Sequence, residues 1–150
     1  MASCLICERI AQIKKRENPY FVAELTTGYI VLGDFQFYKG YTLFLSKDHV
    51  SELSQLKRQV KTVFLKEMAQ AAEAVYKAFK PLKLNYELLG NSDPHLHWHL
   101  FPRYKNDPSP NKPVWVIDKS IRCSDNARPS REELASLKNS LLSELRYLKP

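Results

Sequence analysis

The sequence predicts an α+β fold, in which helices pack against an antiparallel β-sheet and lie apart from its strands along the chain. Short segments rich in β-forming residues predict strands. Two segments with apolar residues at helical spacing predict a long helix across the sheet and a carboxyl-terminal helix. The chain has 150 residues, enough to bury a core, and we expect a single domain over residues 1–150.

Five segments are expected to form the sheet. They lie at residues 20–25, 28–32, 41–46, 83–89 and 95–101. The first two are rich in β-forming residues and flank Thr26-Thr27-Gly28, so they predict a hairpin. Residues 33–40, before the third strand, are unusually aromatic for a loop. These aromatic side chains either line a pocket or fold back on the core.

Two helices are expected before the fourth strand. The first covers residues 4–16 and ends at Asn18-Pro19, because the residue before a proline disfavours the helical backbone. The second has about 25 residues, and Ser51 or Ser54 is expected to cap it. Its apolar residues have the i, i+3, i+4 spacing of a buried stripe, and they are Leu56, Val60, Val63, Phe64, Ala71, Val75 and Phe79.

The chain after the fifth strand is expected to form an exposed loop and then a last helix. Prolines recur in residues 105–113, which is typical of an exposed loop. Ser130 and Glu133 have the spacing of a capping box, in which each side chain binds the backbone N–H of the other residue. The helix that follows carries leucines at helical spacing, namely Leu134, Leu137, Leu141, Leu145 and Leu148.

The composition is that of an ordinary soluble globular protein, with 44% hydrophobic and 26% charged residues. No apolar run approaches the about 20 residues that span a bilayer, and no signal peptide precedes Glu8-Arg9. We therefore expect a cytoplasmic protein without a membrane partner. The net charge is +7, but the lysines and arginines are scattered, so no nucleic-acid polymer is expected as a partner. Positive charge also attracts small phosphate esters.

Three of the four histidines occupy alternate positions of one short segment, residues 95–99. Side chains at i, i+2 and i+4 of a strand share a face, so three imidazoles are expected on one face and apolar residues on the other. Pro94 and Pro102 are expected to bracket this strand, because proline cannot donate to a β-ladder. Three imidazoles on one face are costly as ions and hard to satisfy as neutral groups, which favours metal ligation or catalysis over a structural role. The candidates are His95, His97 and His99, and the apolar residues are Leu96, Trp98 and Leu100.

The segment His95-Leu96-His97-Trp98-His99-Leu100-Phe101 resembles the signature of the histidine triad (HIT) family, and its surroundings fit as well. Gly90 and Asn91 lie upstream, and Pro102-Arg103 follows as in many members. The resemblance covers roughly residues 4–104 and leaves the proline-rich loop and last helix of residues 105–150 unmatched. It implies a HIT-like sheet, a homodimer, and a hydrolase that cleaves nucleoside 5′-phosphoryl bonds of dinucleoside polyphosphates or nucleoside phosphoramidates.

The resemblance also implies a role for each residue of the site. His97 corresponds to the residue that becomes covalently nucleotidylated, and a neutral imidazole nitrogen is a suitable nucleophile near pH 7. His99 corresponds to the histidine on the phosphate and leaving-group side; the uridylyltransferase branch has Gln there, so His99 favours hydrolysis. The implied nucleotide-binding residues are Asp34 for the ribose, Phe35 for the base, and Asn85, Asn91 and Ser92 for the phosphate. Plain turn formation is the alternative explanation for these Asp and Asn residues.

Cys4 and Cys7 form a Cys-x-x-Cys motif, which is typical of half a metal site or a redox pair. No strand precedes Cys4, and this favours the metal site. Some HIT proteins bind structural zinc through such a motif, a histidine after the third strand and the first histidine of the triad. The resemblance therefore implies a Zn²⁺ site made of Cys4, Cys7, His49 and His95, which leaves His97 and His99 for the reaction.

The chain departs from the family pattern in places that affect the shape of the pocket. Tyr41 follows Gly40 where many members have His, and Ser46 replaces a common Pro. Trp115 lies in the carboxyl-terminal segment, which often differs between branches and helps to set specificity, so the substrate stays open. Two alternatives also remain, a nucleotidyltransferase or phosphorylase and a zinc-stabilised nucleotide-binding module without turnover.

Overall fold

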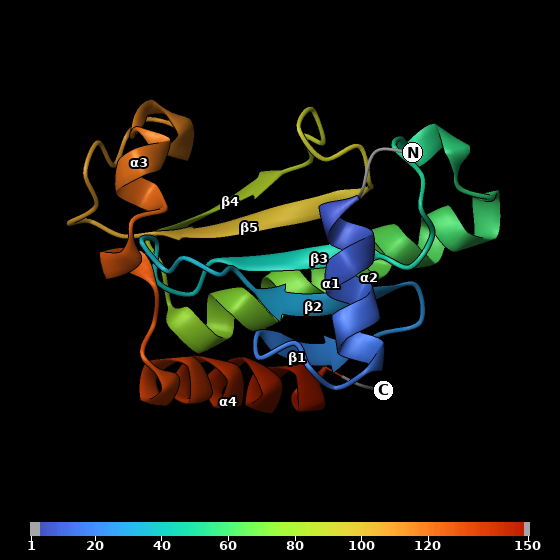
Figure 1. Cartoon of the computed structure of the whole chain (residues 1–150), viewed down its shortest axis with the longest axis horizontal. Coiled ribbons are helices and arrows are strands. Elements are labelled where there is room, and N and C mark those ends of the chain that lie inside the picture. The colour runs from blue at the N-terminus through green and yellow to red at the C-terminus, as the bar shows by residue number, and fades with distance from the viewer. Residues whose placement is uncertain (1–3, 149–150) are drawn as a thin grey trace.

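The computed structural model describes residues 4–148 and contains one five-stranded antiparallel sheet (Figure 1). Its strands are β1 (Phe21–Glu24), β2 (Gly28–Leu32), β3 (Thr42–Ser46), β4 (Lys83–Glu87) and β5 (His97–Arg103). They lie in the order β1-β2-β3-β5-β4, so the histidine strand has a neighbour on each side. This arrangement confirms the predicted α+β fold. Residues 1–3, part of the segment searched for a signal peptide, and residues 149–150 lie outside the described part.

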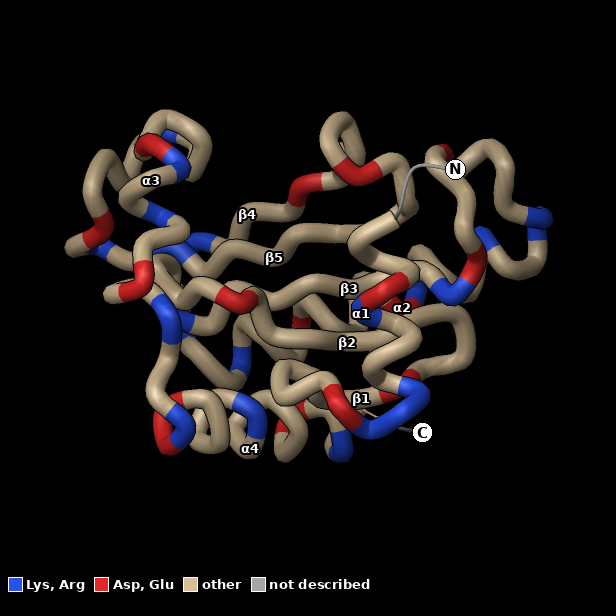
Figure 2. Tube along the Cα trace, viewed as in Figure 1, with Lys and Arg blue, Asp and Glu red and all other residues tan. Residues whose placement is uncertain are grey.

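Helices lie on both faces of the sheet and along one edge. They are α1 (Leu5–Lys14), α2 (Arg58–Phe79), α3 (Lys119–Arg122) and α4 (Arg131–Tyr147). Figure 1 shows α1 in front of the sheet, α2 behind it, α4 along β1, and α3 near the far end of β4 and β5. None of the helices within residues 4–148 has the length and apolar character needed to cross a membrane. Lysines and arginines are interspersed with acidic residues along the trace (Figure 2).

The main core lies between α2, α4 and the face of the sheet that carries the apolar residues of β5. Leu96 and Leu100 are buried there, and the rings of Phe44 and Phe64 stack with centroids 4.9 Å apart. Leu141 of α4 is fully buried in the same core. The predicted leucines of α4 and most of the predicted apolar stripe of α2 belong to this core or pack against it, whereas Leu56 lies before α2 and Val63 is not part of the core. A shared core is what a single domain requires, and the domain organisation stays a prediction.

The other face of the sheet is divided between α1 and an open cavity. Ile6, Ile10 and Ile13 of α1 pack against apolar residues of β2 and β3. The remaining part of this face carries the side chains of His97 and His99. The helix therefore covers only part of the face, and His97 and His99 line the cavity beside it.

Two predicted boundaries are wrong. The helix α2 begins at Arg58 rather than after Ser51 or Ser54, and a 3₁₀ turn precedes it in which the Gln55 carboxamide accepts the backbone N–H of Ser51. Side chains therefore cap the start of this 3₁₀ turn, and no side chain caps the start of α2. Pro102 does not end the histidine strand, which continues to Arg103. Because β5 pairs with β3 only as far as Leu100, the chain beyond it has one strand neighbour and tolerates a residue that cannot donate.

Glu67 of α2 is a buried carboxylate that the sequence analysis did not single out. Its oxygens accept the backbone N–H of Thr26 at 2.7 Å and of Thr27 at 2.8 Å, and also the hydroxyl of Thr27. These donors belong to the predicted hairpin turn between β1 and β2. The side chain therefore binds the turn to the long helix behind the sheet.

We expect Glu67→Gln to lower the free energy of unfolding by about 1–3 kcal/mol, because the new NH₂ group would face backbone donors and leave one of them unpaired. Urea denaturation followed by circular dichroism measures the change. The matched control is Glu73→Gln, which removes only an exposed ion pair with Lys77 one turn away. Equal losses in the two variants would contradict the role of Glu67.

Candidate functional site

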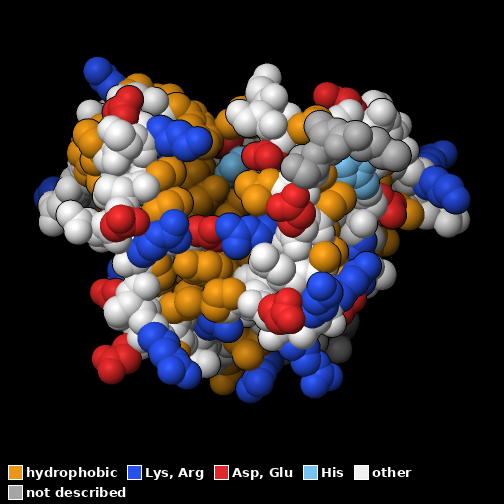
Figure 3. All heavy atoms as spheres, viewed as in Figure 1, with side chains coloured by type: hydrophobic (Ala, Val, Ile, Leu, Met, Phe, Trp, Pro, Cys, Tyr) orange, Lys and Arg blue, Asp and Glu red, His pale blue; other side chains and the backbone are white. Residues whose placement is uncertain are grey.

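A cavity of about 510 Å³ opens over the histidine face of β5. Its walls come from α1, the aromatic loop after β2, the β4–β5 connection and the segment around α3. In Figure 3 the hollow lies between the lobe that contains α3 and the centre of the molecule, with histidine visible inside it. The aromatic loop therefore lines a pocket, which was one of the two alternatives left open by the sequence.

His97 is 5% exposed, and the tautomer of its neutral ring follows from a single contact. Its Nδ1 lies 2.5 Å from the carbonyl oxygen of His95. A carbonyl can only accept, so Nδ1–H donates to it, and Nε2 of the neutral ring keeps a free lone pair. His97 thus brings an unprotonated nitrogen to the cavity that its ring lines.

His99 has a polar partner of another kind. Its Nδ1 lies 2.7 Å from the hydroxyl of Tyr41, and burial raises the pKa of Tyr41 well above its ordinary value, so the hydroxyl keeps its proton. A hydroxyl can donate or accept, so this contact is compatible with either tautomer of the ring. Burial, and then the nearby His97, lower the pKa of His99 to about 3, so the ring is neutral. The ring centroids of His97 and His99 lie 4.7 Å apart, and when Tyr41 donates, an Nε2–H of His99 stands beside the acceptor nitrogen of His97.

Tyr41 is held against His99 by close packing. Its ring is stacked on Phe101 with centroids 4.0 Å apart, and Gly33 faces it from the end of β2. A Cβ on Gly33 would lie 2.2 Å from the Tyr41 ring, so the tyrosine fits here only opposite a glycine. The pocket is therefore shaped to accept the tyrosine at position 41, where the sequence departs from the histidine of many HIT proteins.

Trp115 forms the wall beside His99. Its ring meets His99 edge to face at 5.8 Å, and its Nε1–H donates to the Glu87 carboxylate at 2.7 Å. Glu87 pairs across the sheet with His99, and burial raises the pKa of its carboxyl. The guanidinium of Arg122 lies over the indole at 4.8 Å. Sequence reasoning missed Glu87 and Arg122, because only the fold brings their segments beside the triad.

The predicted nucleoside-binding residues lie at the same cavity. Asp34 and Phe35 line it from the aromatic loop, and Asn91 and Ser92 line it from the β4–β5 connection. Asp34 forms an ion pair with Arg9 of α1. Four of the five predicted nucleotide-binding residues are thus gathered around the two histidines.

Asn85 is the predicted residue that the structure leaves out of the cavity. It lies on the histidine face of the sheet, but its Oδ1 accepts the Nη1–H of Arg103 at 3.0 Å. The same guanidinium pairs with Asp107 and donates to the carbonyl of Lys112, so it anchors the proline-rich loop. Asn85 therefore helps to hold that loop, and the expectation that it contacts phosphate does not agree with its position.

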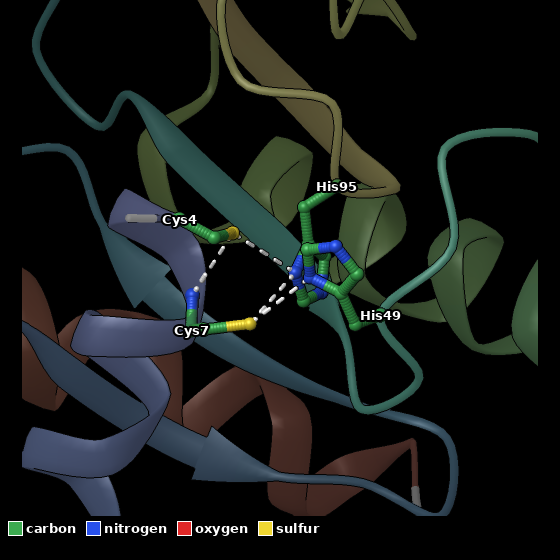
Figure 4. Close-up of side chains that lie close together, drawn as sticks. All are labelled: Cys4, Cys7, His49 and His95. Carbon is green, nitrogen blue, oxygen red and sulfur yellow. Dashed lines mark hydrogen bonds between the residues drawn. The ribbon is translucent and has the colours of Figure 1, made fainter. Parts of the chain in front are cut away.

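Cys4, Cys7, His49 and His95 form a separate cluster beside the cavity (Figure 4). Their ligand atoms all lie within 4.8 Å of one another, and Nδ1 of His95 lies 3.5 Å from both sulfurs. Nε2 of His95 donates to the carbonyl of Ser46 at 2.9 Å, which leaves Nδ1 unprotonated towards the sulfurs. Burial lowers the pKa of His95, which favours the neutral form that binds metals.

This cluster corrects one expectation about the triad. His95 precedes β5, and its ring packs against His49 at 5.0 Å instead of continuing the row of His97 and His99. Two thiols and two imidazoles within this distance are a donor set that suits tetrahedral Zn²⁺. The site could therefore hold a metal, and His97 and His99 lie outside it.

Comparisons with known proteins agree with this geometry. Residues 15–106 match the model of the HIT domain family. Protein hit of Bacillus subtilis (strain 168) is 26% identical over 111 residues, which cover 68% of this chain and 72% of that protein. A histidine triad protein from Marinobacter aquaeolei VT8 has a similar structure, with a TM-score of 0.74, 23% identity, and coverage of 90% of this chain and 96% of that chain.

A Zn-bound histidine triad family protein from Mycobacterium smegmatis is also similar, with a TM-score of 0.65, 21% identity, and coverage of 98% of both chains. The structural likenesses show a common fold, and the family model covers more than half of the chain. With the alternating histidines of β5 at the floor of a cavity, the conclusion is that this chain belongs to the histidine triad (HIT) family.

Proposed function

We propose that this protein hydrolyses nucleoside 5′-phosphoryl bonds, as in dinucleoside polyphosphates or nucleoside phosphoramidates, through a nucleotidyl-His97 intermediate. HIT family members bind nucleotides and are typically nucleotide hydrolases or transferases. The observation that carries the proposal is the free Nε2 lone pair of His97 beside the ring of His99 in one cavity. In this proposal the Tyr41 hydroxyl donates to Nδ1 of His99, so that His99 offers an Nε2–H to the same phosphoryl group.

The reaction follows from these two nitrogens. Nε2 of His97 attacks phosphorus, so a P–N bond forms while the bond to the leaving group breaks. The Nε2–H of His99 donates to the oxygens on which negative charge develops. Water then attacks the same phosphorus, and the P–N bond breaks with its electron pair returning to Nε2 of His97. The nucleoside monophosphate is released, and His97 is free for the next cycle.

The nucleoside is placed on the side of the cavity lined by Asp34 and Phe35. The Asp34 carboxylate can accept hydrogen bonds from the ribose hydroxyls, and Phe35 offers apolar surface to the base. Asn91 and Ser92 supply neutral donors for phosphate oxygens. Asn85 has no part in this proposal, because its side chain is engaged by Arg103.

His97→Ala is expected to lower kcat by about 10³-fold or more, because the step that forms the intermediate loses its nucleophile. The measurement is release of AMP from diadenosine triphosphate and adenosine 5′-phosphoramidate, resolved by chromatography. Circular dichroism and retained AMP binding show that the variant is folded. Undiminished turnover in the variant would rule out the intermediate. Product formation that requires added phosphate would point to a phosphorylase, and failure of the native protein to turn over would leave a binding module.

We also propose that Cys4, Cys7, His49 and His95 hold a structural Zn²⁺. The donor set supports this assignment, and the two thiols come from the N-cap and the first turn of α1 while the imidazoles come from the chain after β3 and before β5. Bound Zn²⁺ would supply a cross-link between these segments. His95 then fixes the metal with one ring nitrogen and the backbone of Ser46 with the other.

The purified protein is expected to contain about one zinc per chain, as measured by inductively coupled plasma mass spectrometry. Cys7→Ser should lose most of this zinc, because it removes one of four ligands. Its melting temperature should fall by about 5 °C or more, since about 2 kcal/mol is lost. Cys123→Ser is the matched control and should keep its zinc, because Cys123 is not part of the cluster. Equal zinc in the two variants would exclude this site.

We propose a homodimer that forms through β4, which is an edge strand of the sheet. Large apolar side chains are exposed on and beside it, with Leu82 at 74%, Tyr86 at 49% and Leu89 at 50% exposure. An exposed strand edge with apolar side chains is suited to pairing with another chain.

Light scattering after size exclusion is expected to give about twice the chain mass of 17.4 kDa. Tyr86→Glu should shift the protein towards the monomer, because it places a charge on the paired surface. Tyr147→Glu on α4, where the tyrosine is 81% exposed, is the control and should stay dimeric. A native protein that elutes with the mass of one chain would contradict the dimer.

A further inference from the structure

We propose that Arg122 and Lys119 form a binding site for an anionic leaving group, so that the substrates of this enzyme carry further phosphates beyond the one that is attacked. The inference rests on the proposed function and narrows it. It selects nucleoside polyphosphates, with or without a second nucleoside, over nucleoside phosphoramidates.

The two cations lie on the His99 side of the cavity. Both side chains line it, and they come from α3, where Lys119 and Arg122 are three residues apart and so lie on neighbouring positions of the helix surface. Trp115 contacts His99 with its ring, and Arg122 lies over that same ring. The guanidinium of Arg122 and the ring of His99 therefore both contact the same indole. Figure 3 shows basic side chains at the edge of the hollow on the α3 side.

These charges have no ion-pair partner in the part of the chain that the structure describes. Within residues 4–148, neither Lys119 nor Arg122 forms an ion pair, whereas Arg9 pairs with Asp34 and Arg103 pairs with Asp107. Hydrogen bonds from Ser120, and to a lesser extent the charge of Arg122, lower the pKa of Asp118. Burial raises the pKa of Glu87 and Arg122 opposes this rise, but neither carboxylate is bonded to Arg122. Glu87 accepts the indole N–H of Trp115, and the carboxylate of Asp118 accepts from Ser120. The two cations are therefore available to a ligand.

Arg122 is also held in position before any ligand arrives. Its Nε–H donates to the carbonyl of Ile117 at 2.8 Å, and its planar group rests on Trp115, which Glu87 fixes in turn. This leaves the Nη groups available, and an arginine offers them to a phosphate as a pair of parallel donors. A side chain ordered in advance loses less entropy on binding.

The charge of the leaving group determines whether these cations can accelerate the reaction. When Nε2 of His97 forms its bond to phosphorus in a polyphosphate, the bond from that phosphorus to the bridging oxygen breaks, and the electron pair stays on that oxygen. The departing phosphate gains one negative charge, which nearby cations stabilise. The amine released from a phosphoramidate takes up a proton and carries no negative charge. Arg122 and Lys119 would therefore accelerate the first reaction and not the second.

The test compares kcat/KM for diadenosine triphosphate, ATP and adenosine 5′-phosphoramidate in the native protein and in Arg122→Gln. We expect the variant to lose about 10–100-fold on the better polyphosphate, since a charge-assisted hydrogen bond is worth about 1.5–3 kcal/mol. The phosphoramidate should change less than about 3-fold. Lys119→Gln should lose less than Arg122→Gln, because its side chain is exposed. Lys112→Gln removes one positive charge from the proline-rich loop, outside the cavity, and should leave kcat/KM unchanged for both kinds of substrate.

Equal losses on both kinds of substrate in Arg122→Gln would overturn the proposal, because they would mean that Arg122 only supports Trp115. Arg122→Lys keeps the charge and should recover part of the activity on the polyphosphate. A preference of the native protein for diadenosine triphosphate over ATP would assign the site to a nucleotide leaving group, and the reverse would assign it to pyrophosphate. Either result supports the proposal if Arg122→Gln abolishes the preference for polyphosphates.

A binding measurement separates this inference from the proposed function. Calorimetry with inorganic pyrophosphate, in the presence of AMP, does not depend on turnover. The affinity of the native protein for pyrophosphate should fall about 10-fold or more in Arg122→Gln and stay the same in Lys112→Gln. Unchanged affinity in Arg122→Gln would refute the anion site even if hydrolysis is observed. A weakened affinity without any hydrolysis would refute the reaction and keep the anion site.

Discussion

Each histidine of the triad has one ring nitrogen held by a hydrogen bond to the protein, and this bond decides what the other nitrogen can do. Nε2–H of His95 donates to the carbonyl of Ser46, Nδ1–H of His97 donates to the carbonyl of His95, and Nδ1 of His99 is hydrogen-bonded to the hydroxyl of Tyr41. In the proposed function, three chemically identical side chains thereby act as a metal ligand, a nucleophile and a hydrogen-bond donor. The rest of the architecture serves to keep these partners in place.

The sheet holds these hydrogen-bond partners in position. Because β5 lies between β3 and β4, the backbone around the histidines is fixed from both sides, and the main core supports it from behind. Segments that are far from β5 in the chain complete the walls of the cavity. Tyr41 reaches His99 only because Gly33 leaves room for its ring, and Trp115 reaches it from the segment that follows the proline-rich loop.

The sequence is sufficient where a function depends on local spacing. Alternation predicts which side of β5 faces the core, and the Cys-x-x-Cys motif predicts two of the clustered donors. The sequence does not predict contacts that depend on the register of paired strands, because a change in the β4–β5 connection would bring a different residue of β4 opposite His99. Glu87, not Asn85, occupies that position. The contacts of Arg122 are equally hidden, because they join the last third of the chain to the triad.

The wall formed by Trp115 and Arg122 lies outside residues 15–106, the part that matches the family model. In the proposed function, the residues that break the bond and the surface that meets the departing group therefore belong to separate stretches of polypeptide. Exchange of the second stretch would then alter which leaving group is accepted while the first keeps its chemistry, so that specificity could diverge within one lineage without loss of the reaction.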